Sequence, residues 1–140
     1  MLEISFSQLD QVTSGPGLYE VHTVSGIKLK VGTGSNLKQR LPDHRASRQR
    51  GLKLKPGGDR SRPQDVVSKK SMLAKHLYYD EAIAPEYDLK TEAGRRDFLM
   101  NSCVVFIQPT TSLLEARRME KNLETSGAFR YVGDVRIRRE

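Results

Sequence analysis

Two short segments joined by a turn constrain the fold of this chain more than any other feature. Residues 18–24 and residues 27–33 both show the two-residue side-chain alternation of a β-strand. Ser25 and Gly26 lie between them, and a two-residue connection that contains glycine is typical of a β-hairpin. We therefore predict an antiparallel hairpin near the start of the chain.

The last predicted helix has the clearest start signal. Ser112 and Glu115 have the spacing of a capping box, and Gly127 is placed to end the helix. Glu120 falls on the edge of the apolar stripe of this helix, so its carboxylate is expected to be partly buried. The stripe consists of Leu113, Ala116, Met119 and Leu123.

Periodicity, capping residues and chain breakers predict the remaining elements. A helix that starts at Ser35 or Asn36 carries Arg40 and His44 on one face, with a kink expected at Pro42. The other expected elements are helices at 5–12, 64–84 and 91–100, a buried strand at 103–107, and a strand or extended tail at 130–137. Together these elements predict a small domain of the α/β (α+β) class that spans residues 1–140.

Composition narrows the cellular setting and the type of metal site. No apolar run approaches the length of a membrane span, and the first residues do not resemble a secretory signal. Cys103 is the only cysteine, which excludes an intrachain disulfide and a clustered-thiolate zinc site. We therefore expect a soluble protein of the reducing cytoplasm, without a membrane partner.

The net charge of +7 is concentrated in one stretch. Residues 38–70 contain eleven basic and three acidic residues, and such an excess favours polyanionic partners such as nucleic acid. Glycines and prolines break residues 45–65, which predicts a mobile loop, although a solvated basic loop without a partner is a common alternative. The candidate nucleic-acid contacts are Lys38, Arg45, Arg48, Arg50, Lys53, Lys55, Arg60 and Arg62.

Four ordered sequence blocks resemble the GIY-YIG nucleases, and in particular the N-terminal nuclease domain of bacterial excision-repair endonuclease. The blocks are Pro16-Gly17-Leu18-Tyr19, Lys30-Val31-Gly32, Asn36-Leu37 with Arg40-Leu41 and His44, and Glu115-Ala116 with Glu120-Lys121-Asn122-Leu123. The resemblance implies a central three-stranded antiparallel sheet flanked by helices. It also implies that DNA phosphodiester bonds are hydrolysed with one divalent cation, Mg²⁺ or Mn²⁺.

The resemblance assigns five site residues. Tyr19 matches the tyrosine of the first motif, Arg40 the helix arginine, His44 a histidine one turn later, and Glu120 the metal-binding glutamate. Lys30 stands where the second motif usually has a tyrosine. The family's late asparagine is absent, with Asp134 a weak substitute, and residues 45–100 are an expected insertion made of the basic loop and the 64–84 helix.

The chemistry of phosphodiester hydrolysis supports these roles. The reaction needs a base for the attacking water and positive charge for the developing oxyanion. Arg40 and His44 are four residues apart, so they can meet one phosphate, and a single carboxylate suffices for a hydrated magnesium ion. Tyr19 could take the proton of the water if Lys30 stabilises its phenolate.

Alternative roles remain open for each residue. Tyr19 could be a structural strand aromatic, Arg40 and His44 ordinary surface charges, and Glu120 a partner of a basic residue on its own helix. A nucleic-acid-binding module of the same fold that has lost catalysis is the alternative function, and an RNA-binding or regulatory domain is a third. The biological role and the oligomeric state are not readable from the sequence.

Overall fold

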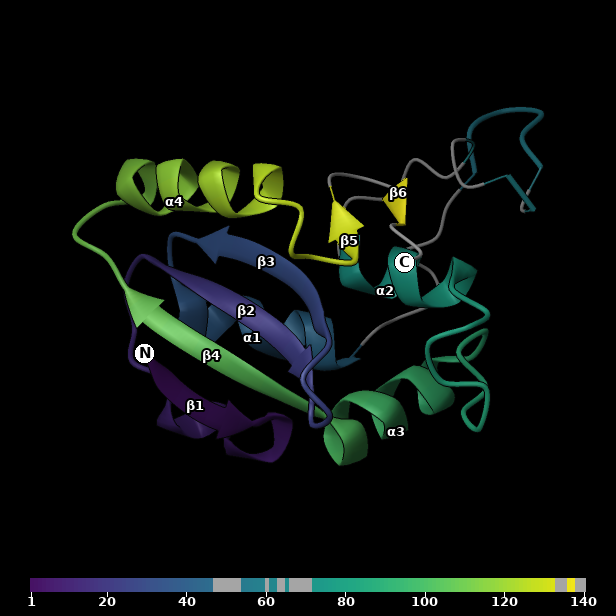
Figure 1. Ribbon diagram of the computed structural model, residues 1–140, viewed down its shortest axis with the longest axis horizontal. Coiled ribbons are helices and arrows are strands. Elements are labelled where there is room, and N and C mark those ends of the chain that lie inside the picture. Colours follow the sequence, from purple (N-terminus) through teal and green to yellow (C-terminus); the bar gives the residue numbers. More distant parts are fainter. Residues whose placement is uncertain (47–53, 60, 63–64, 66–71, 133–135, 138–140) are drawn as a thin grey trace.

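The computed structural model describes residues 1–46, 54–59, 61–62, 65, 72–132 and 136–137. The main sheet has four antiparallel strands in the order β1-β4-β2-β3, and a separate small sheet pairs β5 with β6 (Figure 1). The strands are β1 (Leu2–Ser5), β2 (Gly17–Thr23), β3 (Lys28–Gly34), β4 (Cys103–Pro109), β5 (Tyr131–Val132) and β6 (Arg136–Ile137). The helices are the 3₁₀ helix η1 (Phe6–Gln11) and the α-helices α1 (Leu37–Ala46), α2 (Met72–Tyr79), α3 (Glu92–Ser102) and α4 (Leu113–Thr125).

The predicted hairpin is present as β2 and β3, but its turn is longer than expected. The Thr23 N–H donates to the Ile27 carbonyl, and the Gly26 N–H donates to the Thr23 carbonyl. The connection is therefore the three-residue loop 24–26 rather than Ser25-Gly26 alone. Gly26 has φ = 101°, which is the left-handed conformation that three-residue hairpin loops place at this position.

The sheet has a fourth strand that the sequence did not predict. β1 pairs with β4 along its whole length, from Leu2 opposite Ile107 to Ser5 opposite Val104. The sheet thus has four strands, whereas the resemblance implied three. The predicted helix at 5–12 is shorter and is 3₁₀ in type, and its start is capped because the Ser5 N–H donates to Gln8 Oε1.

Helices cover both faces of the sheet and create two separate apolar clusters. The larger cluster joins one face to η1, α1, α2 and α3, and it includes Tyr19, Leu41, Leu77 and Leu99. The smaller cluster joins Leu18 and Val31 on the opposite face to α4 and to Phe129. In Figure 1, α4 runs along the β3 side of the sheet while α1 passes behind it, so the outer edge of β3 lies between the two helices.

The segment expected to be an insertion contributes directly to the larger cluster. Leu73 and Leu77 of α2 are fully buried there, as are Phe98 and Leu99 of α3. Thr91 caps α3 by accepting a hydrogen bond from the Gly94 N–H, so the helix predicted at 91–100 is confirmed and runs two residues further. The strand predicted at 103–107 is likewise confirmed as β4, and Cys103 is buried, with a pKa that burial raises to about 12.

The helix predicted to run from 64 to 84 ends earlier than expected. Residues 64 and 66–71 lie outside the described part of the chain, and α2 ends at Tyr79. Asp80 then accepts hydrogen bonds from the backbone N–H groups of Ala82 and Ile83, a turn that competes with helix continuation. The Asp80 carboxylate also accepts from Arg130 and from the Tyr131 hydroxyl, which fixes this corner to the chain after α4.

The end of the chain forms a small hairpin instead of one strand. The segment predicted at 130–137 divides into β5 and β6, which pair with each other. α4 is confirmed, because the Ser112 hydroxyl accepts from the Glu115 N–H and Gly127 follows the helix with φ = 85°. The Glu115 carboxylate accepts a hydrogen bond from the Thr111 hydroxyl. Among the described residues, no helix is long and apolar enough to cross a membrane.

Candidate active site

Tyr19 is held on β2 by a glycine on the neighbouring strand. Tyr19 and Gly32 are cross-strand partners in the β2–β3 pair. A Cβ atom at position 32 would overlap the Tyr19 ring and hydroxyl, so only glycine lets the ring lie across β3. Tyr19 is 3% exposed. The glycine of the second sequence motif therefore positions the tyrosine of the first.

α1 brings His44 to the Tyr19 hydroxyl. The Tyr19 hydroxyl oxygen and His44 Nε2 are 2.5 Å apart, and both residues are buried. Leu37 and Leu41 fix α1 against the sheet, because both are fully buried on the same side of this helix. Helix α1 continues through Pro42; the carbonyl it leaves without a helical partner belongs to Lys38, which is exposed.

Both members of this pair are neutral at ordinary pH. Burial raises the pKa of Tyr19, and the nearby Arg40 guanidinium offsets this only in part. Burial and the charges of Arg40 and Lys30 hold the pKa of His44 well below its usual range. A neutral imidazole with its proton on Nδ1 can accept the Tyr19 hydroxyl proton at Nε2. The two residues can therefore form a path for one proton.

The two cations of the site both lower the pKa of His44 but otherwise act on different partners. Arg40 is hydrogen-bonded to Tyr19 and lowers the pKa of that hydroxyl, and it also forms a 3.7 Å ion pair with Asp43. Lys30 is 6% exposed and lowers the pKa values of His44 and Glu120. The electrostatics thus favour Arg40 over Lys30 as the stabilising cation for a Tyr19 phenolate.

α4 contributes two carboxylates where the sequence suggested one. Burial raises the pKa of Glu120, the charge of Glu124 one helical turn later raises it further, and Lys30 and Arg117 lower it. Both glutamates line the same pocket. Glu124 was missed as a site residue, although the four-residue spacing from Glu120 places both on one helix face and was readable.

All five residues assigned by the resemblance line one pocket of about 200 Å³. It lies at the outer edge of β3, between α1 on one side and α4 on the other. The complete lining is Tyr19, Lys30, Gly32, Thr33, Arg40, His44, Met72, Glu120 and Glu124. Residues from β2, β3, α1, α2 and α4 therefore meet at one point, with bases, cations and carboxylates together.

The carboxylate pair fits a hard divalent cation. Magnesium prefers oxygen ligands and is commonly held by one or two carboxylates together with water and phosphate oxygens. The mutual repulsion that raises the pKa of Glu120 would be relieved by a cation next to both glutamates. No group of three or more His, Cys, Asp or Glu side chains that could hold a metal occurs among the described residues. Water and bound substrate would then complete the metal's ligand shell.

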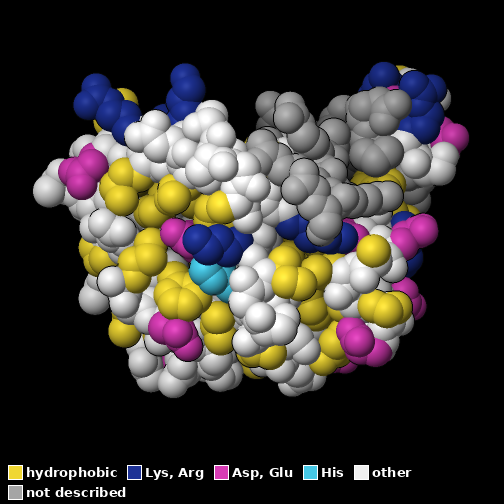
Figure 2. Space-filling view, in the orientation of Figure 1, with side chains coloured by type: hydrophobic (Ala, Val, Ile, Leu, Met, Phe, Trp, Pro, Cys, Tyr) yellow, Lys and Arg dark blue, Asp and Glu magenta, His cyan; other side chains and the backbone are white. Residues whose placement is uncertain are grey.

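The predicted nucleic-acid contacts are only partly placed by the structure. Lys38 is exposed on α1, and Arg45 lies in the last turn of the same helix. Lys55 and Arg62 are exposed, while Arg48, Arg50, Lys53 and Arg60 lie outside the described residues. In Figure 2, basic side chains project at two separate places along the upper rim of the molecule, over α4 and over the described residues of the basic loop, and others lie near the centre of this face.

The described part of the basic loop is organised around one acid. The Asp65 carboxylate accepts the Asp59 N–H at 2.9 Å and forms a 3.1 Å ion pair with Lys55. The Lys55 N–H also donates to the Asp65 carbonyl. These residues of the predicted mobile loop therefore have local hydrogen-bonded structure, and part of the Lys55 charge is balanced within the loop.

No family model, curated protein or solved structure matches the chain. Any function must therefore be inferred from the residues and from the geometry of the pocket. Asp134, the weak substitute predicted for the family's late asparagine, lies outside the described residues.

Proposed function

We propose that the protein is a metal-dependent endonuclease of the GIY-YIG type that hydrolyses phosphodiester bonds of DNA. The observation that carries this proposal is the meeting of Tyr19, His44, Arg40, Lys30 and Glu120 in one pocket. These residues come from distant parts of the sequence, and each supplies a function that phosphodiester hydrolysis needs. The proposed setting is the cytoplasm.

Tyr19 and His44 act together as the general base. The attacking water gives a proton to the Tyr19 oxygen, and the Tyr19 hydroxyl proton passes to His44 Nε2 along their hydrogen bond. The tyrosine thus does not have to persist as a phenolate, which its raised pKa would disfavour. This path replaces the role first considered for Lys30.

Arg40 and Lys30 stabilise the negative charge that develops on the phosphate. Arg40 lies next to the Tyr19 hydroxyl, so its guanidinium can hold the phosphate beside the attacking water. Lys30 is nearly buried, and a cation in such a place acts more strongly than one in water. A tyrosine is therefore not required at position 30 for charge stabilisation.

Glu120 and Glu124 would hold the divalent cation. Mg²⁺ or Mn²⁺, when bound, supplies positive charge to the phosphate oxygens. Glu120 is the more important of the two, because it is close enough to Tyr19 to affect its pKa. The lysine and arginines around the carboxylates limit the site to one cation.

The alternative function is a nucleic-acid-binding module of the same fold. The basic rim supports DNA binding under either hypothesis, since phosphate contacts need only positive charge. The grouping of the Tyr19–His44 hydrogen bond with Arg40, Lys30 and Glu120 in one pocket favours the enzyme, because phosphate binding alone does not need a proton path or a carboxylate.

A matched pair of glutamate variants tests the proposal. Glu120→Gln should abolish cleavage of plasmid and oligonucleotide DNA while leaving DNA affinity nearly unchanged. Glu115→Gln, on the exposed side of the same helix, should keep full activity. Equal cleavage by the two variants would reject the assigned site, and cleavage that persists in EDTA would reject metal dependence.

A further inference from the structure

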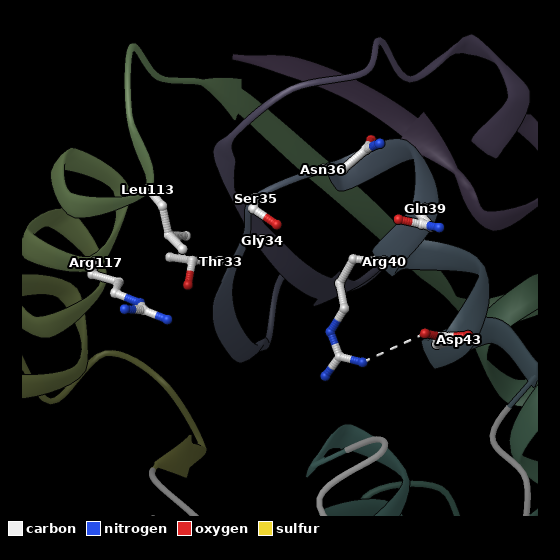
Figure 3. A pocket seen from close by; sticks show the side chains of 9 residues that line it. All are labelled: Thr33, Gly34, Ser35, Asn36, Gln39, Arg40, Asp43, Leu113 and Arg117. Carbon is white, nitrogen blue, oxygen red and sulfur yellow. Dashed lines mark ion pairs between the residues drawn. The ribbon is translucent and has the colours of Figure 1, made fainter.

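A second pocket lies next to the catalytic pocket, and the two share Thr33 and Arg40. Its volume of about 480 Å³ falls in the range of small-molecule sites. Figure 3 shows that its walls come from the end of β3, from the start of α1 and from the first turns of α4. A group bound here would be adjacent to the reacting phosphate.

Positively and negatively charged side chains are separated across this pocket. In Figure 3, Arg117 of α4 and Asp43 of α1 lie on opposite sides of the pocket, with Arg40 between them. Asp43 already pairs with Arg40 and is about half exposed. A phosphate group bound in this pocket, in addition to the reacting phosphate, would be repelled by Asp43 and attracted by Arg117. The Arg117 side of the pocket is therefore the anion-binding side.

The remaining lining suits a nucleoside. Leu113 and the Thr33 methyl group offer an apolar surface beside Arg117, while Ser35 and Gln39 offer hydrogen-bonding groups on the α1 side. An apolar wall with a few polar groups is the usual composition of a site for a sugar and a base. Asp43 at the α1 side can accept a hydrogen bond from a base N–H group.

We infer that this second pocket binds the nucleoside next to the scissile phosphate, and that Arg117 binds the following phosphate of the same strand. The inference rests on the proposed function for the identity of the ligand. It adds a binding residue, Arg117, that neither the sequence motifs nor the catalytic pocket includes. A nucleotide lodged between α1 and α4 would be separated from its pairing partner, so unpaired DNA is the expected substrate class.

Thymidine 3′,5′-bisphosphate is the probe, because it carries two phosphates on one nucleoside and contains no phosphodiester bond to cleave. Its affinity is compared with those of thymidine 5′-monophosphate and thymidine 3′-monophosphate by calorimetry. In the wild-type protein the bisphosphate should bind at least about tenfold more tightly than either monophosphate, the usual size of a hydrogen bond to a charged group. Arg117→Gln should reduce to about one the ratio against thymidine 5′-monophosphate, which keeps the phosphate of the catalytic pocket.

Arg118→Gln is the matched control, since Arg118 is an exposed arginine on the same helix and lines neither pocket. Arg118→Gln should keep the wild-type ratio of bisphosphate to monophosphate affinity. Because the ratio is measured within one variant, the effect of Arg117 on the ionisation of Glu120 cancels. A ratio that Arg117→Gln leaves unchanged, or a wild-type protein that does not bind the bisphosphate, overturns the inference.

The outcome is separable from that of the proposed function. Tight bisphosphate binding that depends on Arg117, in a protein that cleaves no DNA, would retain the nucleotide pocket and reject the nuclease. DNA cleavage by a protein in which Arg117→Gln leaves the ratio of bisphosphate to monophosphate affinity unchanged would support the nuclease and reject the nucleotide pocket. Equal cleavage rates on fully paired and unpaired DNA would overturn the inferred substrate class.

Discussion

The Tyr19 hydroxyl and His44 Nε2 lie 2.5 Å apart in a position buried from solvent, with one residue on β2 and the other on α1. The pKa of Tyr19 is raised and that of His44 is lowered, so both are neutral and share one proton position. The pair is therefore the centre of the proposed mechanism.

The first prediction is that Tyr19 and His44 act as one unit. Tyr19→Phe and His44→Gln should each lower the single-turnover cleavage rate about 10²- to 10⁴-fold, the usual contribution of general base catalysis. The double variant should be little slower than the slower single variant, because residues in one proton path are not additive. Tyr87→Phe, which removes a hydroxyl bonded to Ser102, is the control and should keep the wild-type rate.

Independent action of the two residues would give a different result. If His44 only contacted phosphate, the rate reductions from Tyr19→Phe and His44→Gln would multiply in the double variant. That outcome would reject proton transfer from Tyr19 to His44, although both residues would still belong to the active site.

The second prediction concerns the ionisation of Glu120 in the metal-free protein. Its pKa should lie above the ordinary 4.5, because burial and the charge of Glu124 both disfavour the carboxylate. Glu124→Gln removes one of these causes and should lower the pKa of Glu120, measured by carbon NMR of the side-chain carboxyl groups. Glu92→Gln, on α3, should leave it unchanged.

Metal binding and cleavage should follow the same titration. The carboxylate form of Glu120 is needed for the cation, so both should be lost as the pH falls through the raised pKa of Glu120. The acid limit of activity should move to lower pH in Glu124→Gln. A limit that stays in place would show that another group controls it.

The third prediction concerns the salt dependence of DNA binding. Replacing Arg48, Arg50 and Lys53 with glutamine should flatten the slope of log K against log salt by about 0.9 for each phosphate that the variant no longer neutralises. Lys55→Gln should have a smaller effect, since the ion pair with Asp65 already balances part of its charge. The measurement is fluorescence anisotropy on labelled DNA over a range of salt concentrations.

A control with the same change in charge tests whether the effect is local. Glutamine in place of Lys28, Lys90 and Arg96, which lie outside the basic loop, should leave the slope nearly unchanged. Similar slopes for the two triple variants would mean that binding depends on net charge alone and not on the loop.

The fourth prediction concerns the corner where α2 ends. Asp80 is 2% exposed and accepts two hydrogen bonds from Arg130 and one from Tyr131, so Asp80→Asn should lower the free energy of unfolding by about 3 kcal/mol. Glu92→Gln breaks the exposed pair with Arg96 and should cost less than about 1 kcal/mol. Urea unfolding at pH 7 provides the comparison.

The pH dependence of this effect has a definite sign. Burial alone would raise the pKa of Asp80, but the hydrogen bonds from Arg130 and Tyr131 lower it below the ordinary 3.8. The stabilisation is therefore complete above pH 3.8 and is lost as the pH falls through the lower pKa of the folded state. A difference between wild type and Asp80→Asn that persists at much lower pH would contradict this assignment.

The sequence predicted the elements whose signals are local. β2, β3, α3 and α4 follow from side-chain periodicity and from capping by Thr91 and Ser112. β1 was missed because a four-residue strand shows little periodicity and is fixed only by pairing with β4, about a hundred residues later. The end of α2 was missed because Asp80 is held by Arg130, fifty residues further along the chain.

The same distinction applies to the site. The motifs gave the positions of Tyr19, Arg40, His44 and Glu120, but spacing alone could not show which groups touch. The Tyr19–His44 hydrogen bond and the action of Arg40 on Tyr19 depend on how α1 packs against the hairpin. For this reason Arg40, and not Lys30, is the cation expected to act on the Tyr19 hydroxyl.

The most direct test of the account is DNA cleavage by the purified wild-type protein with Mg²⁺ or Mn²⁺, on single-stranded, double-stranded and branched substrates. The account predicts metal-dependent cleavage that EDTA stops and that Tyr19→Phe reduces at least about 100-fold. Absence of cleavage on every substrate with both metals, in a preparation that binds DNA, would contradict the nuclease proposal and support the binding module instead.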